Sequence, residues 1–323
     1  MKTLIISDTH FGNHEDFANY EKVVNSRLLL QIRAFGKALE IGARESCDRI
    51  IHLGDVFHKR GQVEPEAFNL CKEAIERAAS RSSLKEIIIL TGNHDITMEG
   101  EVFNTAYMLQ GVAGITTVIT EPTLCPSKSG EMEVFIPFCK EGFETHVAPS
   151  KAKDFVLYMH QSVFGASYNR PILKGVDPKL LKNFKRVYCG HIHEPQVIGK
   201  NIYIVGAPYP MNFGDKKHHR VLIDTGAGLP ATYRIEHPEF ITVDDPSQIS
   251  NDGNFYRLVT DAPPDESVGS NVRVVVKPKL KEGRKIKAAT DRELLEEYAR
   301  REGIKDKDIK KMVDVGIKFL EDK

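Results

Sequence analysis

The sequence contains no tryptophan and only five cysteines, none of them in a C-x-x-C pair. An odd number of cysteines without paired spacing argues against a disulfide framework and predicts a reducing compartment, the cytoplasm. Long hydrophobic runs are also missing, since the longest, such as Thr3–Ser7 and Glu86–Leu90, are the size of strands and far shorter than the roughly 20 residues that span a bilayer. The N-terminal segment reaches Asp8 and His10 before the apolar stretch of a signal peptide would be complete. We therefore expect no membrane span and no secretion.

An excess of charge of one sign is absent too, because 45 basic side chains balance 45 acidic ones. Hydrophobic residues make up 41% and charged residues 28% of the chain, which excludes a disordered or collagen-like protein. Acidic residues predominate in 1–150 and basic residues in 151–220. A cation site beside a polyanion-binding surface gives such a distribution, and so does ordinary solvated surface charge.

Short apolar runs alternate with helical patterns in the first two-thirds of the chain. Thr3–Ser7, Arg49–Leu53 and Glu86–Leu90 predict buried strands of a helix-covered sheet. Apolar residues at three- and four-residue spacing over 17–39 and 68–79 predict two helices. Further strands are expected at Phe155–Met159, Arg186–Cys189, Ile202–Val205 and Val221–Asp224. Together these elements predict an α/β sandwich with helices outside two sheets.

A domain boundary is expected near residue 225, where the turn-rich stretch Thr225–Pro230 begins. It divides a first domain, 1–225, from a smaller α+β domain, 226–323. The second domain is expected to contain strands at 255–259 and 272–276 and a helix that begins at the capping box of Thr290 and Glu293. An apolar stripe from Ile309 to Leu320 predicts a last helix that either packs on its own domain or docks on a partner.

Metal-capable side chains follow five predicted strands, at the point where each strand ends. They are Asp8, His10, Asp55, Asn93, His160, His191 and His193. Because open α/β sheets place their sites at the carboxyl ends of strands, we expect these side chains to converge. Oxygen and imidazole donors without cysteine favour Mn²⁺, Fe²⁺ or Zn²⁺. Seven donors suit two ions that share a carboxylate and activate water for attack on a phosphoryl group, with His94 as the proton donor to the leaving oxygen.

Each of these motifs is weak by itself. A D-x-H tripeptide or a single histidine after a strand is more often a turn or a satisfied polar contact, and Gly54, Gly92 and Gly190 can simply supply tight turns. The combination is far more specific, because all five motifs occur in one order and each follows an apolar run. D-x-H, G-D, G-N-H-D, a single H and G-H-x-H, in that order, resemble the signature of the calcineurin-like metallophosphoesterases.

The resemblance implies a two-sheet αββα fold with a dinuclear centre, most often of Mn²⁺, with Mg²⁺ as the alternative. It assigns four ligands to each ion, with Asp55 shared between them, and makes His94 the general acid. The first set is Asp8, His10, Asp55 and His193, and the second is Asp55, Asn93, His160 and His191.

Two branches of that family fit poorly, because 54–61 lacks the second aspartate of the Ser/Thr phosphatases and has His58 where purple acid phosphatases need tyrosine. The G-D-x-F-H motif and the segment Ile204–Asp215 are similar to the SbcD-type nucleases, and the length is that of compact versions encoded by bacteriophages. The resemblance implies 3′→5′ exonuclease activity on duplex DNA ends and endonuclease activity on single strands. It further implies roles in DNA recombination, repair and replication, and an SbcC-type, SMC-like ATPase subunit as partner.

Several alternatives stay open from the sequence alone. A small-molecule phosphodiesterase or phosphatase of the same family, or a scaffold without activity, would also contain this fold, and a homodimer is left open. His58 and Asp95 are expected to touch the substrate phosphate or to orient a metal ligand. A basic run in the predicted capping domain suits DNA phosphate contacts, with a solvated loop as the alternative: Arg273, Lys277, Lys279, Lys281, Arg284, Lys285 and Lys287. His14 and His219 are assigned to the surface.

Overall fold

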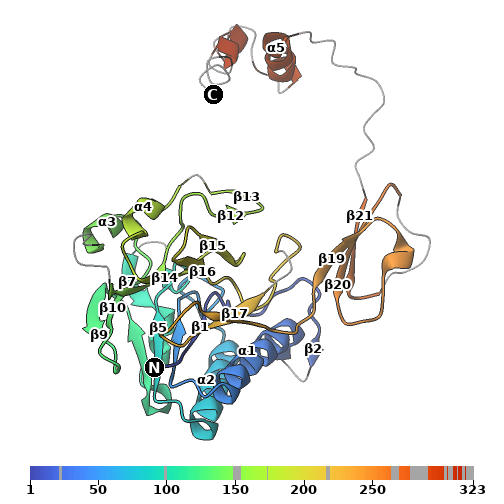
Figure 1. Ribbon diagram of the computed structural model, residues 1–323. Coiled ribbons are helices and arrows are strands. Elements are labelled where there is room, and N and C mark those ends of the chain that lie inside the picture. Colours follow the sequence, from blue (N-terminus) through green and yellow to red (C-terminus); the bar gives the residue numbers. More distant parts are fainter. Residues whose placement is uncertain are drawn as a thin grey trace. The chain divides into compact units, whose positions relative to one another are not determined.

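Two six-stranded mixed sheets form the centre of the protein in the computed structural model (Figure 1). The structure describes residues 1–21, 24–97, 100–147, 154–172, 174–215, 219–262, 269–276, 290–301, 304, 308–310, 312–314 and 317. The first sheet has the order β18 (Ala231–Arg234), β17 (Arg220–Asp224), β1 (Thr3–Ile6), β4 (Arg49–His52), β5 (Glu86–Leu90) and β8 (Thr116–Ile119). The second has the order β15 (Gln196–Ile198), β16 (Ile202–Ile204), β14 (Arg186–Gly190), β11 (Val156–His160), β10 (Met132–Ile136) and β9 (Thr123–Pro126).

The central strands of both sheets run parallel, which brings their carboxyl ends to the same edge. In the first sheet β1, β4, β5 and β8 pair in parallel, and in the second β10, β11, β14 and β16 do so. The antiparallel strands lie at the margins. This arrangement places the loops after β1, β4, β5, β11 and β14 next to one another.

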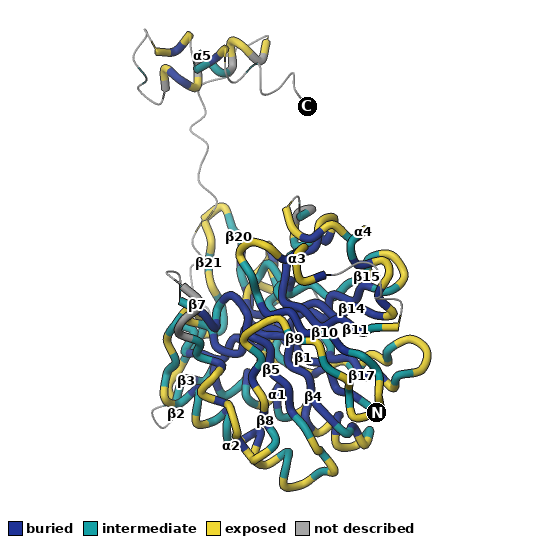
Figure 2. Tube along the Cα trace, turned by 90° about the vertical axis from the view of Figure 1, so that its left-hand side faces the viewer, coloured by how far each residue is buried: buried dark blue, intermediate teal, exposed yellow. Residues whose placement is uncertain are grey.

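The two sheets pack face to face through a continuous apolar core (Figure 2). Ile5, Ile51 and Leu90 of the first sheet meet Tyr158 and Tyr188 of the second. Their strands are apolar on both faces because helices cover the outer sides. Helices α1 (Ser26–Arg44) and α2 (Pro65–Arg81) pack on the first sheet, and the short helices α3 (Phe143–His146) and α4 (Pro178–Leu181) lie beside the second. The predicted αββα sandwich is confirmed.

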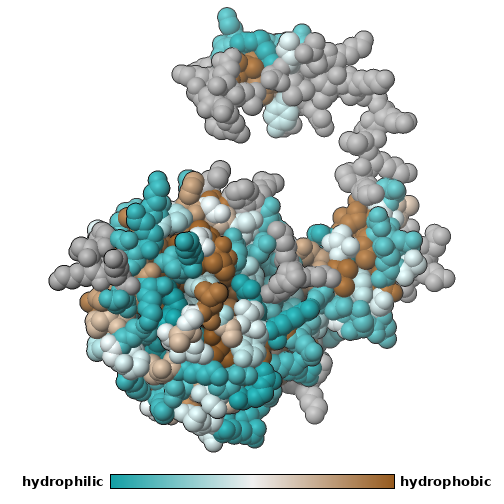
Figure 3. Space-filling model, viewed as in Figure 1, coloured by the Kyte–Doolittle hydropathy of each residue, from teal (hydrophilic) through white to brown (hydrophobic). Residues whose placement is uncertain are grey.

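The surface is of the opposite character, since hydrophilic residues predominate around a narrow hydrophobic band in the view of Figure 3. Shorter elements lie between the main strands and helices. They are β2 (Tyr20–Glu21), β3 (Val24–Asn25), β6 (Ile96–Thr97), β7 (Gly100–Asn104), β12 (Ser167–Tyr168), β13 (Arg170–Pro171) and the 3₁₀ turns η1 (Thr105–Leu109), η2 (Val112–Gly114) and η4 (Pro246–Gln248). None of the helices in the described part of the chain has the length and apolar content to cross a membrane.

Helix α1 begins nine residues later than the apolar periodicity predicts, at Ser26 rather than at Phe17. Asn25 is the reason: its side chain accepts hydrogen bonds from the backbone N–H groups of Arg27, at 2.9 Å, and Leu28, at 3.3 Å. Asparagine is among the strongest N-cap residues, and this local signal overrides the periodicity before it. Strands β8, β9 and β10 were missed by the sequence analysis, because their runs are short and partly polar.

A third sheet follows the sandwich and consists of β19 (Phe240–Val243), β20 (Phe255–Thr260) and β21 (Val272–Val276). Contacts between residues divide the chain at Val276, so that this sheet groups with the sandwich rather than with the C-terminal residues. The predicted boundary at residue 225 stays a prediction. Arg273 on β21 is exposed and forms an ion pair with Asp16 at 3.2 Å, whereas Lys277 to Lys287 of the basic run lie outside the described residues.

The C-terminal unit, residues 276–323, contains helix α5 (Asp291–Arg301). The predicted capping box is confirmed, because Thr290 N–H donates to Glu293 at 3.1 Å and Glu293 N–H donates to the Thr290 hydroxyl at 3.3 Å. Ile309 and Val313 are buried with Ala299 of α5 in a small core. The described part of the predicted apolar stripe therefore packs on its own unit.

Candidate metal centre

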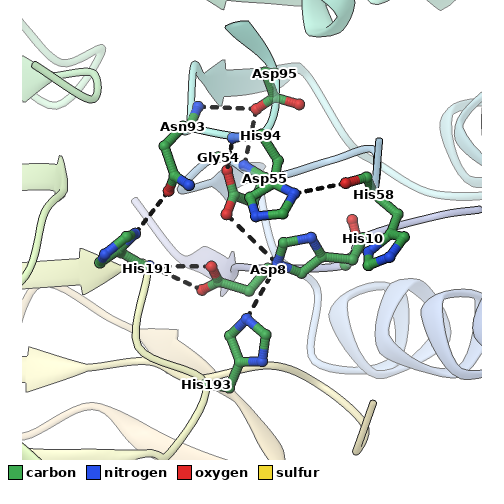
Figure 4. Close-up of polar contacts among 12 residues, drawn as sticks. Asp8, His10, Gly54, Asp55, His58, Asn93, His94, Asp95, His191 and His193 are labelled. Carbon is green, nitrogen blue, oxygen red and sulfur yellow. Dashed lines mark hydrogen bonds and ion pairs between the residues drawn. The ribbon is translucent and has the colours of Figure 1, made fainter. Parts of the chain in front are cut away.

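The last residue of β11 and the loops after β1, β4, β5 and β14 bring the seven predicted ligands to one edge of the sandwich. Figure 4 shows six of them: Asp8, His10, Asp55, Asn93, His191 and His193. Three groups of potential ligand atoms form there, and within each group the atoms lie within 4.8 Å of one another. The first group is Asp8, His10 and His193, the second is Asp55, His160 and His191, and a third, His10, His58 and His94, shares His10 with the first. Asn93 lies beside the second group, because its Oδ1 is 2.7 Å from His191 Nδ1 and 3.1 Å from His160 Nε2.

Four of these residues have a backbone conformation that non-glycine residues rarely adopt. The φ angles are 53° at Asp8, 43° at His10, 55° at Asp55 and 81° at His191. Positive φ at such residues has a free-energy cost of about 1–3 kcal/mol each and clusters at functional sites. The sharp turns direct each side chain inward as soon as its strand ends.

In the first group, the nitrogen atoms of two imidazoles face each other. His10 Nε2 lies 3.1 Å from His193 Nε2 and 3.4 Å from Asp55 Oδ2. Imidazole nitrogens at this distance either share one hydrogen or both direct lone pairs at a cation. The carboxylate of Asp8 is held by the backbone N–H of His191, at 3.0 and 3.1 Å from its two oxygens.

In the second group, a backbone carbonyl fixes the orientation of a histidine. His160 Nδ1 donates to the carbonyl oxygen of Leu53 at 2.6 Å, which leaves Nε2 as the ring nitrogen that faces the site. That Nε2 is 3.4 Å from Asp55 Oδ1. Since Asp55 Oδ2 faces the first group, one carboxylate spans both groups, as a bridging ligand would.

Burial and neighbouring charges shift the pKa values of the site residues in the protein without cations. Burial, together with the charge of Asp55, raises the pKa of Asp8, and burial lowers the pKa of His10 well below its usual value. Burial and the neighbouring His160 lower the pKa of His191 to about 3. Burial opposes protonation of His160 as well, but the charges of Asp55 and Asp8 raise its pKa to about 9. Buried carboxylates beside the neutral imidazoles of His10 and His191 are a donor set that fits divalent cations.

Two glycines contribute more than the turns that the sequence analysis allowed for them. A Cβ on Gly92 would lie 2.2 Å from Asp55 Oδ1, and a Cβ on Gly54, whose φ is 101°, would lie 2.7 Å from His160 Nδ1. Only glycine permits these two loops to approach the shared carboxylate and the histidine so closely.

Asp95 lies behind the ligands rather than in front of them. Its buried carboxylate accepts hydrogen bonds from the backbone N–H groups of Asp55 at 2.8 Å, Val56 at 3.1 Å and Gly92 at 2.8 Å. Burial and the charge of Asp55 raise the pKa of Asp95 to about 7. Asp95 therefore fastens the loop after β4 to the loop after β5 and orients Asp55.

His94 is attached to the same shared carboxylate. Its backbone N–H donates to Asp55 Oδ1 at 2.7 Å, and its Nδ1 donates to the carbonyl oxygen of His58 at 2.5 Å. The ring centroid lies 4.6 Å from that of His10. Because Nδ1 is used in this bond, Nε2 is the other ring nitrogen of His94.

Three residues near the site were missed by the sequence analysis. His14 is not a free surface residue, because its ring packs on that of His58 at a centroid distance of 4.3 Å. Asp215 lies with Oδ1 3.9 Å from His193 Nδ1, and the only signal for it was its place at the end of the segment 204–215. His219 was wrongly assigned to the surface, since it is 2% exposed and bonds to the Ala207 carbonyl.

Comparisons with known proteins give one family match and several distant similarities. Residues 1–195 match the family model described as calcineurin-like phosphoesterase. Exonuclease subunit 1 of Enterobacteria phage T4 is 22% identical over 224 residues, which cover 68% of this chain and 63% of the phage protein. The matched chain thus spans less than two thirds of that relative's length. A putative phosphoesterase of invertebrate iridescent virus 3 is 22% identical over 302 residues, covering 88% of this chain and 82% of the viral protein. A crystal structure of a protein from Thermus thermophilus has a TM-score of 0.46 at 12% identity and covers 73% of this chain and 99% of its own.

Proposed function

The chain belongs to the calcineurin-like phosphoesterase family, and we propose that within this family it is a DNA nuclease that hydrolyses phosphodiester bonds with two divalent cations. Enzymes of the family are hydrolases with dinuclear metal centres. The observation that carries the proposal is that Asp8, four histidines and Asn93 converge around the carboxylate of Asp55, with His94 beside them. The similarity to a phage protein named as an exonuclease subunit supports DNA as the substrate.

We assign Asp8, His10, Asp55 and His193 to one cation and Asp55, Asn93, His160 and His191 to the other. Cations held there supply positive charge that binds a phosphodiester, activates water and offsets the charge of the transition state. The chain's own contribution is to keep the donors in place before substrate arrives. The Leu53 carbonyl orients His160, the His191 N–H holds Asp8, and Asp95 holds the loop of Asp55.

His94 is proposed as the general acid. The hydrogen bond from Nδ1 to the His58 carbonyl holds the ring in one orientation, and Nε2 gives its proton to the oxygen that leaves from phosphorus. Proton transfer by a positioned side chain typically contributes a factor of about 10²–10⁴ to the rate.

We propose further that the enzyme acts as a 3′→5′ exonuclease on duplex ends and as an endonuclease on single strands, with Mn²⁺ as the preferred ion. In this proposal it serves recombination, repair and replication of DNA together with an SbcC-type ATPase subunit. The phage relative is named as a subunit of an exonuclease, which supports a multi-chain assembly. Residues 226–323 would cap the nuclease domain and dock on the partner, and 273–287 would contact DNA phosphates.

A second candidate function is a phosphoesterase for small molecules. It is favoured by the relative from iridescent virus 3, which is named a putative phosphoesterase and whose match extends over 88% of this chain. The metal centre would be the same and only the substrate would differ.

The test compares DNA hydrolysis by His94→Ala, Asp55→Ala and wild type in Mn²⁺, with exposed His146→Ala as the matched control. We expect His94→Ala to retain both cations and to lose about 10²–10⁴-fold in rate. Asp55→Ala is expected to lose cations and more activity than His94→Ala. Metal analysis of the purified variants checks the first part of each expectation.

Substrate choice is measured separately, with linear duplex DNA, single-stranded DNA, and chromogenic phosphate mono- and diesters. A protein that cleaves monoesters well and leaves DNA intact would contradict the nuclease assignment and favour the second candidate. Equal cation loss in the two alanine variants would contradict the roles assigned to His94 and Asp55.

A further inference from the structure

The ring nitrogen of His193 that points away from the candidate cation has no hydrogen-bond partner among the described residues. Nε2 of this ring faces His10 Nε2 at 3.1 Å, so the metal-facing side of His193 is set. Nδ1 on the opposite side is buried and unbonded. His160 differs, because its corresponding nitrogen is satisfied by the Leu53 carbonyl. A buried N–H without an acceptor destabilises the structure by about 1–3 kcal/mol, so an acceptor is to be expected at this position.

Asp215 is the carboxylate that lies toward this nitrogen. Its Oδ1 is 3.9 Å from His193 Nδ1, and its side chain is 1% exposed. Two other groups already bind the carboxylate: the Tyr168 hydroxyl donates to Oδ1 at 2.7 Å, and the Met211 N–H donates to Oδ2 at 2.6 Å. A carboxylate accepts about four hydrogen bonds, so Asp215 retains capacity for one from His193.

The segment before Asp215 is anchored on the three-stranded sheet. Phe213 packs on Phe240 at a centroid distance of 5.0 Å, and the guanidinium of Arg257 lies 4.7 Å from the Phe213 ring. The Tyr168 ring, whose hydroxyl binds Asp215, lies 5.8 Å from the His193 ring. Asp215 is thus held from both sides. A residue that fixes the orientation of another has to be held in place itself.

We propose that Asp215 is a positioning residue for the metal centre, which accepts a hydrogen bond from His193 Nδ1 when Nε2 of that ring binds a cation. Cation binding at Nε2 makes the Nδ1–H a stronger donor, and a carboxylate behind a ligating histidine fixes its tautomer and increases its basicity. The ring and the carboxylate have to approach by about 1 Å to reach hydrogen-bond distance. This inference rests on the proposed function, since it assigns His193 to the first cation.

The test is calorimetric titration of the metal-free, full-length protein with Mn²⁺, in the absence of DNA. We expect Asp215→Asn to weaken one of the two cation sites by about 10–100-fold, which is typical of partners behind a ligating histidine, and to leave the other unchanged. Tyr168→Phe is the matched control, because it removes one hydrogen bond to Asp215 but leaves the carboxylate, and its cation affinity should equal that of wild type. In the background of His193→Gln, Asp215→Asn should have no further effect.

A second measurement needs no substitution. In wild-type protein labelled with ¹⁵N at histidine, addition of Zn²⁺ should produce a Nδ1 proton signal from His193 that is shifted downfield and protected from exchange. Unchanged affinities in Asp215→Asn, equal weakening by Tyr168→Phe, or the absence of that proton signal would each overturn the proposal. None of these measurements uses DNA. A protein that gives the expected results but does not cleave DNA would therefore contradict the nuclease assignment and leave the role of Asp215 in place.

Discussion

Both ends of the sandwich bury charge between the two sheets, but only one end balances it within the chain. At the end opposite the candidate metal centre, Arg49 on β4 forms a buried pair with Glu133 on β10, with Nη1 2.7 Å from Oε2. Arg186 on β14 pairs with Asp224 on β17 at 3.1 Å. At the metal end, the ion-pair partners of Asp55 in the described part of the chain are His10 and His160.

The difference follows from the direction of the strands. Arg49 and Arg186 are the first residues of parallel strands, whereas the candidate metal ligands are at the last residue of a strand or just after it. The guanidinium groups at the first end meet their carboxylates across the sheets. Burial does not discharge Arg49, because hydrogen bonding and charge from Glu133 outweigh burial and raise the pKa of Arg49. At the other end, imidazoles replace guanidinium groups. One end is therefore balanced by guanidinium groups of the chain, and the other presents a donor set that cations would fit.

The largest effect on folding is expected from breaking the balanced end. Glu133→Gln leaves Arg49 buried without its counter-charge, and we expect it to lower the free energy of unfolding by about 3–5 kcal/mol. Urea denaturation of the metal-free protein measures it. Glu76→Gln on α2, which removes an exposed pair with Lys72, is the control and should change stability by less than about 0.5 kcal/mol. If Glu133→Gln also weakened cation binding, the two ends would not be independent.

Cation removal probes the unbalanced end. At a free Mn²⁺ concentration of 100 times the dissociation constant, each occupied site should stabilise the folded protein by about 2.7 kcal/mol. Thermal or urea unfolding with Mn²⁺ and with a chelator measures the difference. Glu133→Gln should retain this increment, and Asp55→Ala should lose most of it. If Mn²⁺ stabilised Asp55→Ala as much as wild type, the stabilising cations would bind at a site that does not include Asp55.

The candidate site was more predictable from the sequence than the balanced end, for a physical reason. A candidate ligand that follows a strand is visible in the local sequence, as an apolar run, a sharp turn and then a polar side chain. Asp8, Asp55 and His191 were identified in the sequence in this way. The pairing of Arg49 with Glu133 depends on how two sheets stack, and nothing near either residue in the sequence encodes it. Strand β10, which carries Glu133, was itself missed.

The same distinction explains the residues that were missed at the site itself. Asp215 and His14 reach it through the packing of loops, on the His193 ring and the His58 ring respectively. Asn25 shows the opposite case, a local capping signal that was present in the sequence but was outweighed by the apolar periodicity around it.

Proton release on cation binding is a smaller effect that is confined to the unbalanced end. The charges of Asp55 and Asp8 outweigh burial and raise the pKa of His160 to about 9, so this ring is protonated at pH 7.5 in the metal-free protein. A cation needs the neutral ring, so binding should release about one proton, and affinity should rise about tenfold per pH unit until about pH 9. Titration calorimetry in buffers of different ionisation enthalpy counts the protons. Release that does not fall above pH 9 would contradict the assignment to His160.

The smallest expected effect has the opposite sign. Burial, with the charge of Asp55, raises the pKa of Asp8, so at neutral pH its ionised form destabilises the metal-free fold relative to the unfolded chain. Asp8→Asn removes that charge, keeps an oxygen for the His191 N–H, and places its new amide beside the buried Ser7 hydroxyl. We expect the chelated variant to be more stable than chelated wild type, on the order of 1 kcal/mol, the usual scale of exchanging function for stability. Its stabilisation by Mn²⁺ should shrink at the same time. Urea unfolding with and without Mn²⁺ measures both quantities. If Asp8→Asn instead destabilised the chelated protein, as Glu133→Gln should, the buried carboxylates at both ends would stabilise the metal-free fold in the same way.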